Sequence, residues 1–361
     1  MIKDLSQKQK AVRFCVAAGM VPYMEVVVRY VADVTDVQSD ISDVDVLGIR
    51  PAGLQAQKKV IFDCKTQNKV SAISRALWAA GLIKLIDASE GYVILNKAAP
   101  EGHRLAANSL GIRLTSEKLF DDFGKSASPA YFEGSTYLDN LVAWEYIHGI
   151  PRVNAALDEL VSFLLNDAPL QNDPKSGFRN LISKLRHAEG ELDAGKKPHI
   201  ALWGLVICEA LRFLSEICTD FHNIFDPAME KGKFESLLRN FVWGGRESYG
   251  IRQKLHMAIR ANKAEKDIAN FEFPGWPVFL EMMRTFLDAP HLVSSGILPL
   301  KDISFKVLCD VSELADKRIK AELSVNSRAR QFILLANKYL GHLSPHFKEC
   351  SDYYNKLLTS T

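Results

Sequence analysis

The chain has 361 residues, of which 47% are hydrophobic and 24% are charged, and its formal net charge is +2. This composition is typical of a globular protein, and the length is enough for two or three domains. The near balance of charges excludes a polycation, so a nucleic-acid-binding surface on this chain has to be a local patch.

The cysteines and the apolar stretches indicate a compartment without disulfides. None of the six cysteines forms a C-x-x-C pair or a Cys/His spacing suited to zinc, so we expect reduced, buried thiols. The first ten residues are polar and lack the apolar segment of a signal peptide. The longest apolar stretch, 200–218, carries Glu209, Arg212 and Glu216, which favours a buried helix over a membrane span. We therefore expect a cytoplasmic protein with no membrane partner.

The first third of the chain alternates between strand and helix patterns. Ser6 is a candidate N-cap for a helix over 6–19, and a valine-rich strand is predicted over 25–34. The remaining predicted elements are strands at 44–49 and 60–64, a helix at 68–86, a strand at 91–95, a helix at 100–110 and a strand at 112–114. The order α-β-β-β-α-β-α-β predicts an α/β domain over 1–122, with a mixed central sheet flanked by helices.

From about residue 121 the pattern becomes helical, after a loop-like segment at 126–130. Helices are predicted over 136–146, 153–165, 177–192, 200–221, 233–242, 251–269, 276–287, 305–323 and 327–340, with a last one around Tyr353. No fixed repeat period supports a solenoid. We predict a mostly α-helical second domain over 131–361, serving recognition, regulation or oligomerisation.

Acidic residues and one lysine lie on two adjacent predicted strands. Side chains alternate along a strand, so Asp63 and Lys65 share a face, as do Asp43 and Asp45 on the strand before. If those faces match, carboxylates and an ammonium group meet within a few ångströms. Clustered carboxylate oxygens suit Mg²⁺ or Mn²⁺, with the backbone carbonyl of Cys64 as a further ligand. A bound metal ion and a neighbouring lysine are suited to phosphodiester hydrolysis.

These segments resemble the PD-(D/E)xK nuclease superfamily, which has the restriction-endonuclease-like fold, and within it Mrr-type restriction enzymes and Holliday-junction resolvases. The resemblance covers about residues 5–120. Its segments are SDVDVL at 42–47, FDCKT at 62–66, SRALW at 74–78, GYVIL at 91–95 and AANSLGIRL at 106–114. The proline that gives the superfamily its name is absent before Asp45, and the second acidic segment has Asp63 where Glu is commoner.

The resemblance implies a role for each matching residue. Asp45 is the implied first metal ligand, Asp63 the second and Lys65 the catalytic lysine. Asp43 is an alternative first ligand. Related enzymes often add an upstream glutamate, for which Glu25 is the candidate, and Gln67 is a further candidate contact to the phosphate or to water, or a polar residue at a strand end.

The implied function is metal-dependent phosphodiester hydrolysis by a DNA endonuclease, with DNA preferred over RNA, acting as an effector of antiviral defence against foreign DNA. Relatives that cut duplexes often act as dimers, so a homodimer or a partner protein bound through the helical domain is expected. One alternative is a catalytically idle nucleic-acid-binding or scaffold protein that acts through its helical domain. Another is a sensor in the helical domain with the nuclease as its output.

A second candidate surface is the basic segment 231–266, which also contains aromatic residues. Its candidate phosphate contacts are Arg246, Arg252, Lys254 and Arg260. The alternative for this segment is a solvated helix face.

Overall fold

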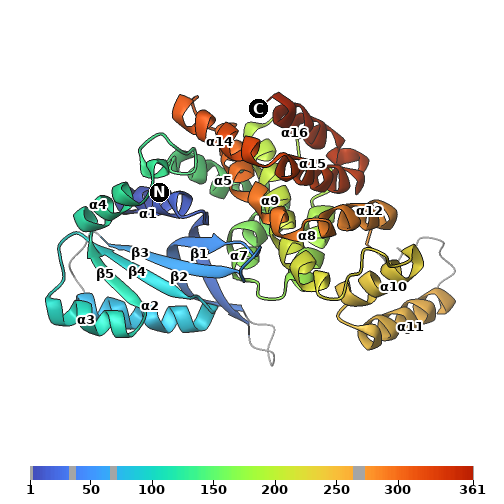
Figure 1. Ribbon diagram of the computed structural model, residues 1–361, viewed down its shortest axis with the longest axis horizontal. Coiled ribbons are helices and arrows are strands. Elements are labelled where there is room, and N and C mark those ends of the chain that lie inside the picture. Colours follow the sequence, from blue (N-terminus) through green and yellow to red (C-terminus); the bar gives the residue numbers. More distant parts are fainter. Residues whose placement is uncertain (1–2, 32–37, 66–70, 263–272, 361) are drawn as a thin grey trace.

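The computed structural model describes residues 3–31, 38–65, 71–262 and 273–360. It has a mixed five-stranded sheet with helices in the N-terminal part and an array of helices after it (Figure 1). This arrangement confirms the predicted element order of the first third and the largely helical character of the rest. Within these ranges, none of the helices combines the length and the apolar character that crossing a membrane requires.

The sheet follows the order of the chain, β1-β2-β3-β4-β5. Its strands are β1 (Val21–Val31), β2 (Gln38–Arg50), β3 (Lys58–Lys65), β4 (Glu90–Leu95) and β5 (Ile112–Ser116). The first three strands pair antiparallel, and β3, β4 and β5 pair in parallel. β3 is thus a central strand, which explains why its residues from Lys59 to Cys64 are all buried.

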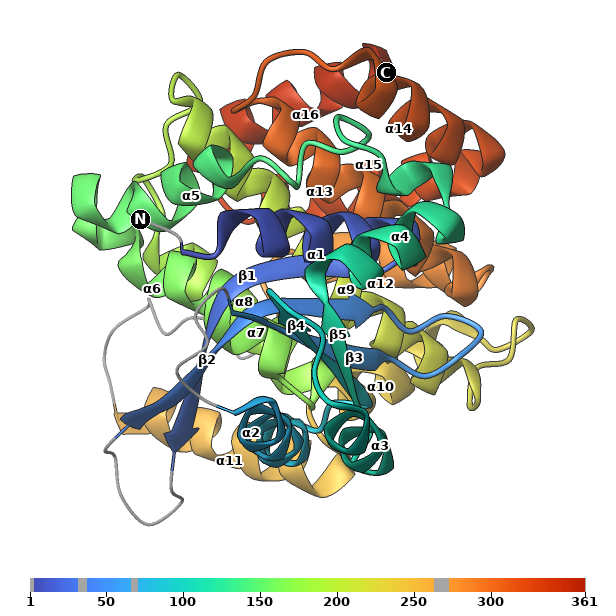
Figure 2. The same cartoon turned by 90° about the vertical axis from the view of Figure 1, so that its left-hand side faces the viewer.

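Helices cover both faces of the sheet (Figures 1 and 2). On one face lie α1 (Leu5–Ala17) and α4 (Glu117–Ala127), and on the other lie α2 (Ala72–Ile86) and α3 (Glu101–Ser109). An aromatic cluster joins α1 and α4 to the sheet, with Phe14, Phe62, Tyr92 and Phe120 in mutual ring contact. The N-caps Ser71 and Ser116 accept hydrogen bonds from backbone N–H groups at the starts of α2 and α4.

The helical part is built around α9 (Lys197–His222), which is buried along most of its length. The elements that contact α9 include α5 (Leu141–Val153), α8 (Pro174–His187), α13 (Ile297–Lys306), α15 (Ser327–His342) and α16 (Lys348–Ser360). The other helices are α6 (Asp158–Ser162), α7 (Ala168–Leu170), α10 (Lys231–Val242), α11 (Arg246–Asn262), α12 (Trp276–Leu287) and α14 (Glu313–Val325). Short 3₁₀ and π turns connect several of them.

One predicted helix is wrong and others have different ends. The single helix predicted over 305–323 is two helices, because the backbone N–H of Ser312 bonds the Tyr137 hydroxyl at 3.0 Å and its hydroxyl bonds the Gly134 carbonyl. Ser312 then caps α14. The helix predicted from residue 136 begins at Leu141, where the Asn140 side chain accepts hydrogen bonds from two backbone N–H groups. Sequence periodicity carries no information on the long-range partners of Ser312, whereas the Asn140 cap is a local signal that periodicity alone does not detect.

Buried polar contacts join the sheet to the helical part. Tyr23 on β1 donates a short hydrogen bond to Glu209 on α9, and Glu209 pairs with the fully buried Arg212 at 2.8 Å. On β3, the ammonium group of Lys59 bonds the side chain of Asn172 at 2.6 Å and the carbonyl of Leu170 at 3.3 Å. Without partners, the buried ions Glu209, Arg212 and Lys59 would each cost several kcal/mol. Because these ions find partners across the junction, the contacts hold the sheet against the helices in a fixed orientation.

Glu216, on α9 at this junction, makes the folding stability of the protein depend on pH. Burial raises its pKa from 4.5 to about 7, although Arg212 lies 3.4 Å away and opposes the shift. A raised carboxyl pKa means that the folded chain holds the proton more tightly than the unfolded chain does, so stability falls as pH rises from 4.5 to 7. Glu216→Gln should therefore match the wild type near pH 4.5 and exceed it at pH 8, by up to about 3 kcal/mol.

Urea unfolding of both proteins at a series of pH values measures this difference. Glu281→Gln is the control, because Glu281 is exposed on α12, a different helix from that of Glu216. A Glu216→Gln curve parallel to the wild-type curve across this pH range would contradict the assignment.

Candidate active site

Asp45 and Asp63 are buried side by side on adjacent strands. They are 4% and 3% exposed, and the registers Val46↔Phe62 and Leu47↔Ile61 place their strands directly together. Lys65, at the end of β3, has its ammonium nitrogen 3.5 Å from Asp45 Oδ2 and 3.9 Å from Asp63 Oδ1. Its side chain is 33% exposed, so the lysine lies between the two buried acids and solvent.

A second lysine, which the sequence interpretation missed, binds one of these two acids, Asp45, from helix α1. Lys8 on α1 is buried, and its ammonium nitrogen lies 3.0 Å from Asp45 Oδ1 and in short contact with Glu25 Oε1. Burial lowers the pKa of Lys8, but Asp45 and Glu25 outweigh that effect and raise the pKa to about 12. Lys8 is therefore charged at neutral pH and bridges the two carboxylates.

Glu25 reaches this cluster through an unusual backbone conformation. Its φ is +55°, in the left-handed region that non-glycine residues rarely adopt. Glu25 lies within β1, between the residues of the pairs Met24↔Val46 and Val26↔Val44. Such a conformation costs about 1–3 kcal/mol and is common where function needs a particular side-chain direction. Here the side chain meets Lys8, beside Asp45.

Arg75, also missed from the sequence, holds Asp63. Its Nε lies 2.9 Å from Oδ2 of Asp63, and its Nη2 makes a short contact with Oδ1. Burial raises the pKa of Asp63, and Arg75 opposes that shift. The ion pairs thus form a chain from Glu25 through Lys8, Asp45, Lys65 and Asp63 to Arg75, with three acids and three cations.

The other predicted residues have varied positions. Asp43 is exposed on β2, and the ion pairs with Lys8 and Lys65 are made by Asp45. Gln67 lies outside the described residues. The contact seen at Cys64 is from its backbone N–H to Asp45 Oδ2, at 2.7 Å, and its carbonyl as a metal ligand stays a prediction. The cluster gains a further contact from Gln7 on α1, whose amide donates to the Lys65 carbonyl at 3.2 Å.

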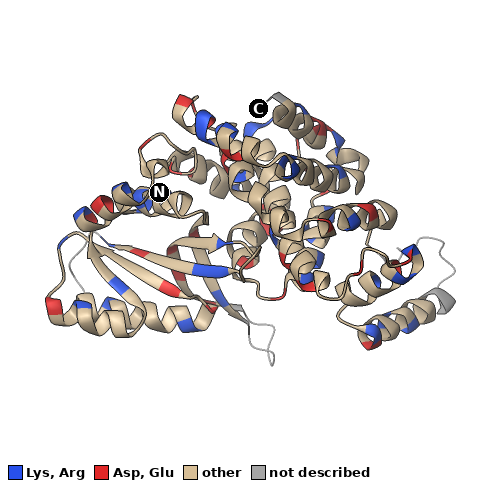
Figure 3. Cartoon of the chain, in the orientation of Figure 1, with Lys and Arg blue, Asp and Glu red and all other residues tan. Residues whose placement is uncertain are grey.

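The basic segment does not join this site. Arg246, Arg252 and Lys254 are exposed on α11, at the opposite end of the molecule from the sheet (Figure 1). Arg260 belongs to the same helix. Figure 3 shows that positions of both charges are spread over the sheet and the helical part. A role for α11 in nucleic-acid binding stays a prediction, and it would need a ligand long enough to contact both ends.

The carboxylate oxygens of this site are suited to a hard divalent cation, but in the structure the protein's own cations contact those oxygens. Carboxylate oxygens on two strands, with a third acid nearby, are the ligands that Mg²⁺ and Mn²⁺ prefer. However, both oxygens of Asp63 contact Arg75, and those of Asp45 contact Lys8, Lys65 and the Cys64 N–H. Across the described ranges, no three His, Cys, Asp or Glu side chains are arranged to hold a metal ion.

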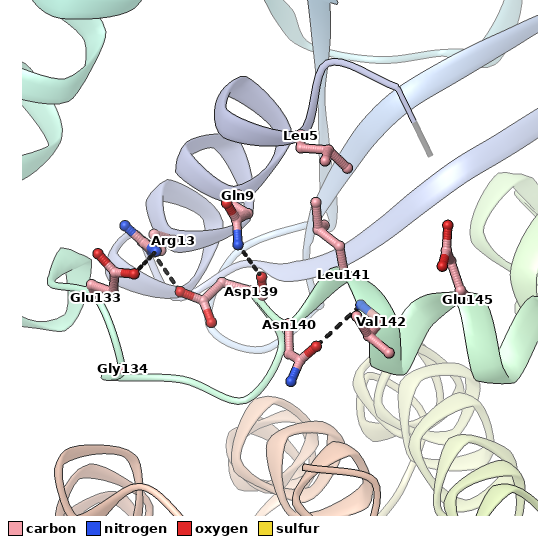
Figure 4. A pocket seen from close by; sticks show the side chains of 10 residues that line it. All are labelled: Leu5, Gln9, Arg13, Glu133, Gly134, Asp139, Asn140, Leu141, Val142 and Glu145. Carbon is pink, nitrogen blue, oxygen red and sulfur yellow. Dashed lines mark hydrogen bonds and ion pairs between the residues drawn. The ribbon is translucent and has the colours of Figure 1, made fainter. Parts of the chain in front are cut away.

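A cavity of about 580 Å³ lies on the other side of α1 (Figure 4). Leu5, Gln9 and Arg13, spaced four residues apart on α1, line it, whereas Lys8 faces the sheet. Arg13 pairs with Asp139 at 2.5 Å, and Gln9 donates to the Asp139 carbonyl at 3.1 Å. These contacts fix α1, the helix that carries Lys8, against the loop before α5. The cavity itself is separate from Asp45 and Asp63, which are not among its lining residues.

No protein-family model, curated protein or solved structure matches this chain.

The ion-pair chain predicts that Lys8 is needed for stability. Lys8→Met leaves Glu25 without the lysine and Asp45 with one fewer cation, and breaking a buried pair in this way costs about 3–5 kcal/mol. Lys10→Met is the matched control on the same helix, because the Lys10–Glu117 pair is partly exposed and such pairs contribute at most about 1 kcal/mol. Urea unfolding measures both, and an equal loss in the two variants would contradict the role given to Lys8.

Proposed function

We propose that this chain is a metal-dependent nuclease that hydrolyses phosphodiester bonds, with Asp45, Asp63 and Lys65 at the reacting centre. The observation that supports it most is the convergence of two buried carboxylates on one half-exposed lysine, at the carboxyl end of β3. Burying two carboxylates costs several kcal/mol each, so a chain that keeps them side by side gains something other than stability. In α/β sheets, ligands bind outside the carboxyl ends of parallel strands, where Lys65 lies.

In this proposal, the position of each residue indicates its role. Asp45 and Asp63 would hold the metal ion, with Glu25 as a further acid beside Asp45. The ion would supply an activated water and stabilise developing negative charge. Lys65 has its ammonium group at the solvent side of both acids, where it can hold the attacking water or the phosphate oxygen. The resemblance adds DNA as the expected substrate and defence against foreign DNA as the expected setting.

The ionic balance favours one alternative, a catalytically idle nucleic-acid-binding or scaffold protein. Three acids already pair with three cations, so the cluster is held together without a metal ion. In this alternative the helical part carries the partner surface, and Asp63 and Lys65 are needed for stability alone.

A cleavage panel separates these functions. Supercoiled, linear duplex and single-stranded DNA and RNA are incubated with the purified chain and Mg²⁺ or Mn²⁺, with and without a chelator. We expect cleavage that needs the metal and falls on the order of 100-fold or more in Asp63→Asn and in Lys65→Ala.

Lys125→Ala and Asp193→Asn are the controls, since both residues form surface pairs away from the sheet's acids. They should cleave like the wild type. Absence of metal-stimulated cleavage, or equal rates in the wild type and both site variants, would favour the idle protein.

A further inference from the structure

Arg75 is the closest cation to Asp63 and occupies both of its oxygens. The guanidinium forms a two-pronged contact, with Nε 2.9 Å from Oδ2 and Nη2 against Oδ1, whereas Lys65 lies 3.9 Å from Oδ1. Arginine fits a carboxylate in this fork geometry better than lysine does. A metal ion on Asp63 needs at least one of the same oxygens, and its positive charge repels the guanidinium, so the ion and this fork contact of Arg75 compete for Asp63.

The Arg75 side chain has a second partner, Trp78, that can hold it near the site when it leaves Asp63. Its side chain is 19% exposed, while Asp63 is 3% exposed, so the guanidinium lies on the solvent side of the acid. It also stacks on the ring of Trp78, one turn along α2, at 4.4 Å from the ring centroid. This stacking is independent of Asp63 and can keep the guanidinium at the mouth of the site.

Another anion is the strongest replacement for Asp63 as the partner of Arg75. The guanidinium stays protonated at all accessible pH values, so deprotonation does not release it. A phosphate group accepts the same fork of two N–H donors as a carboxylate. A nucleic-acid strand that reaches Lys65 offers such a group at the solvent side of the acids.

We propose that Arg75 closes the metal position on Asp63 until nucleic acid binds, and that it then moves to a phosphate of the strand. This inference rests on the proposed nuclease function. Metal and nucleic acid then bind cooperatively, and the coupling is reciprocal because each favours the state in which Arg75 has left Asp63. The site would load its metal ion in the presence of substrate and stay closed without it.

The test is a calorimetric titration of Mn²⁺ into the full chain and into Arg75→Gln, without nucleic acid. If Arg75 leaves Asp63 a tenth of the time or less, Arg75→Gln should bind Mn²⁺ about tenfold more tightly or better. Arg113→Gln is the matched control, because Arg113 also pairs with an acid, Glu90, and stacks on a ring, Tyr92. It should bind Mn²⁺ like the wild type. Arg75→Lys keeps the positive charge without the two-pronged contact and should give an intermediate Mn²⁺ affinity. If Arg75→Gln does not fold, Arg75→Lys replaces it in the comparison.

A second titration adds a short DNA duplex with uncleavable phosphorothioate linkages. The duplex should raise the Mn²⁺ affinity of the wild type towards that of Arg75→Gln and change the variant little. Equal Mn²⁺ affinities in the wild type and the Arg75 variants, or a duplex without effect on the wild type, would overturn the role of Arg75.

Asp63→Asn separates this failure from failure of the nuclease proposal. If the wild type and the Arg75 variants bind Mn²⁺ equally well and Asp63→Asn weakens that binding, the metal site is supported and only the role of Arg75 is refuted. Mn²⁺ binding that Asp63→Asn does not weaken, in the wild type or with Arg75→Gln, overturns both.

Discussion

Two buried carboxylates determine how the N-terminal sheet and its helices are held together. Asp45 and Asp63 lie in the interior of a sheet, where an uncompensated charge costs several kcal/mol. The structure meets this cost with cations from three different elements: Lys8 from α1, Lys65 from β3 and Arg75 from α2. The helices on opposite faces of the sheet are therefore tied to the same point on it. Glu25 joins them at the expense of a left-handed backbone.

This arrangement links stability to the proposed chemistry. The ion pairs that make the acids tolerable in the folded chain also take up the oxygens that a metal ion needs. A protein that only required stability could replace such a cluster with apolar residues of similar volume, often with a gain. In the proposed function, the cluster serves a ligand that exchanges with one of the cations. Arg75 is the cation best placed to exchange, since it is partly exposed and has Trp78 as a second partner.

Local sequence patterns were sufficient for the strands that carry the acids and insufficient for their partners. The alternation that places Asp63 and Lys65 on one face depends only on neighbouring residues, and so does the valine-rich β1. Lys8 and Arg75 reach the acids through tertiary packing. A signal existed for Lys8, which shares an apolar helical face with Ala11, Val12 and Cys15 and is therefore a lysine facing the core. The break at Ser312 depends on bonds to residues 134 and 137, and its local signal is Ser312 itself, a capping residue followed by Glu313 and Asp316 in the first turn of α14. Helical periodicity alone does not reveal this signal.

In the proposed mechanism, Asp45 and Asp63 hold a metal ion that Arg75 otherwise keeps out. Crystals of the full chain grown with Mn²⁺ and a phosphorothioate duplex test it directly, because anomalous diffraction locates the ion independently of the protein atoms. We expect a peak within about 2.0–2.4 Å of oxygens from both carboxylates, with the Arg75 guanidinium on a phosphate and still stacked on Trp78. An Arg75 fork still closed on Asp63, with no anomalous peak at the two acids, would contradict it.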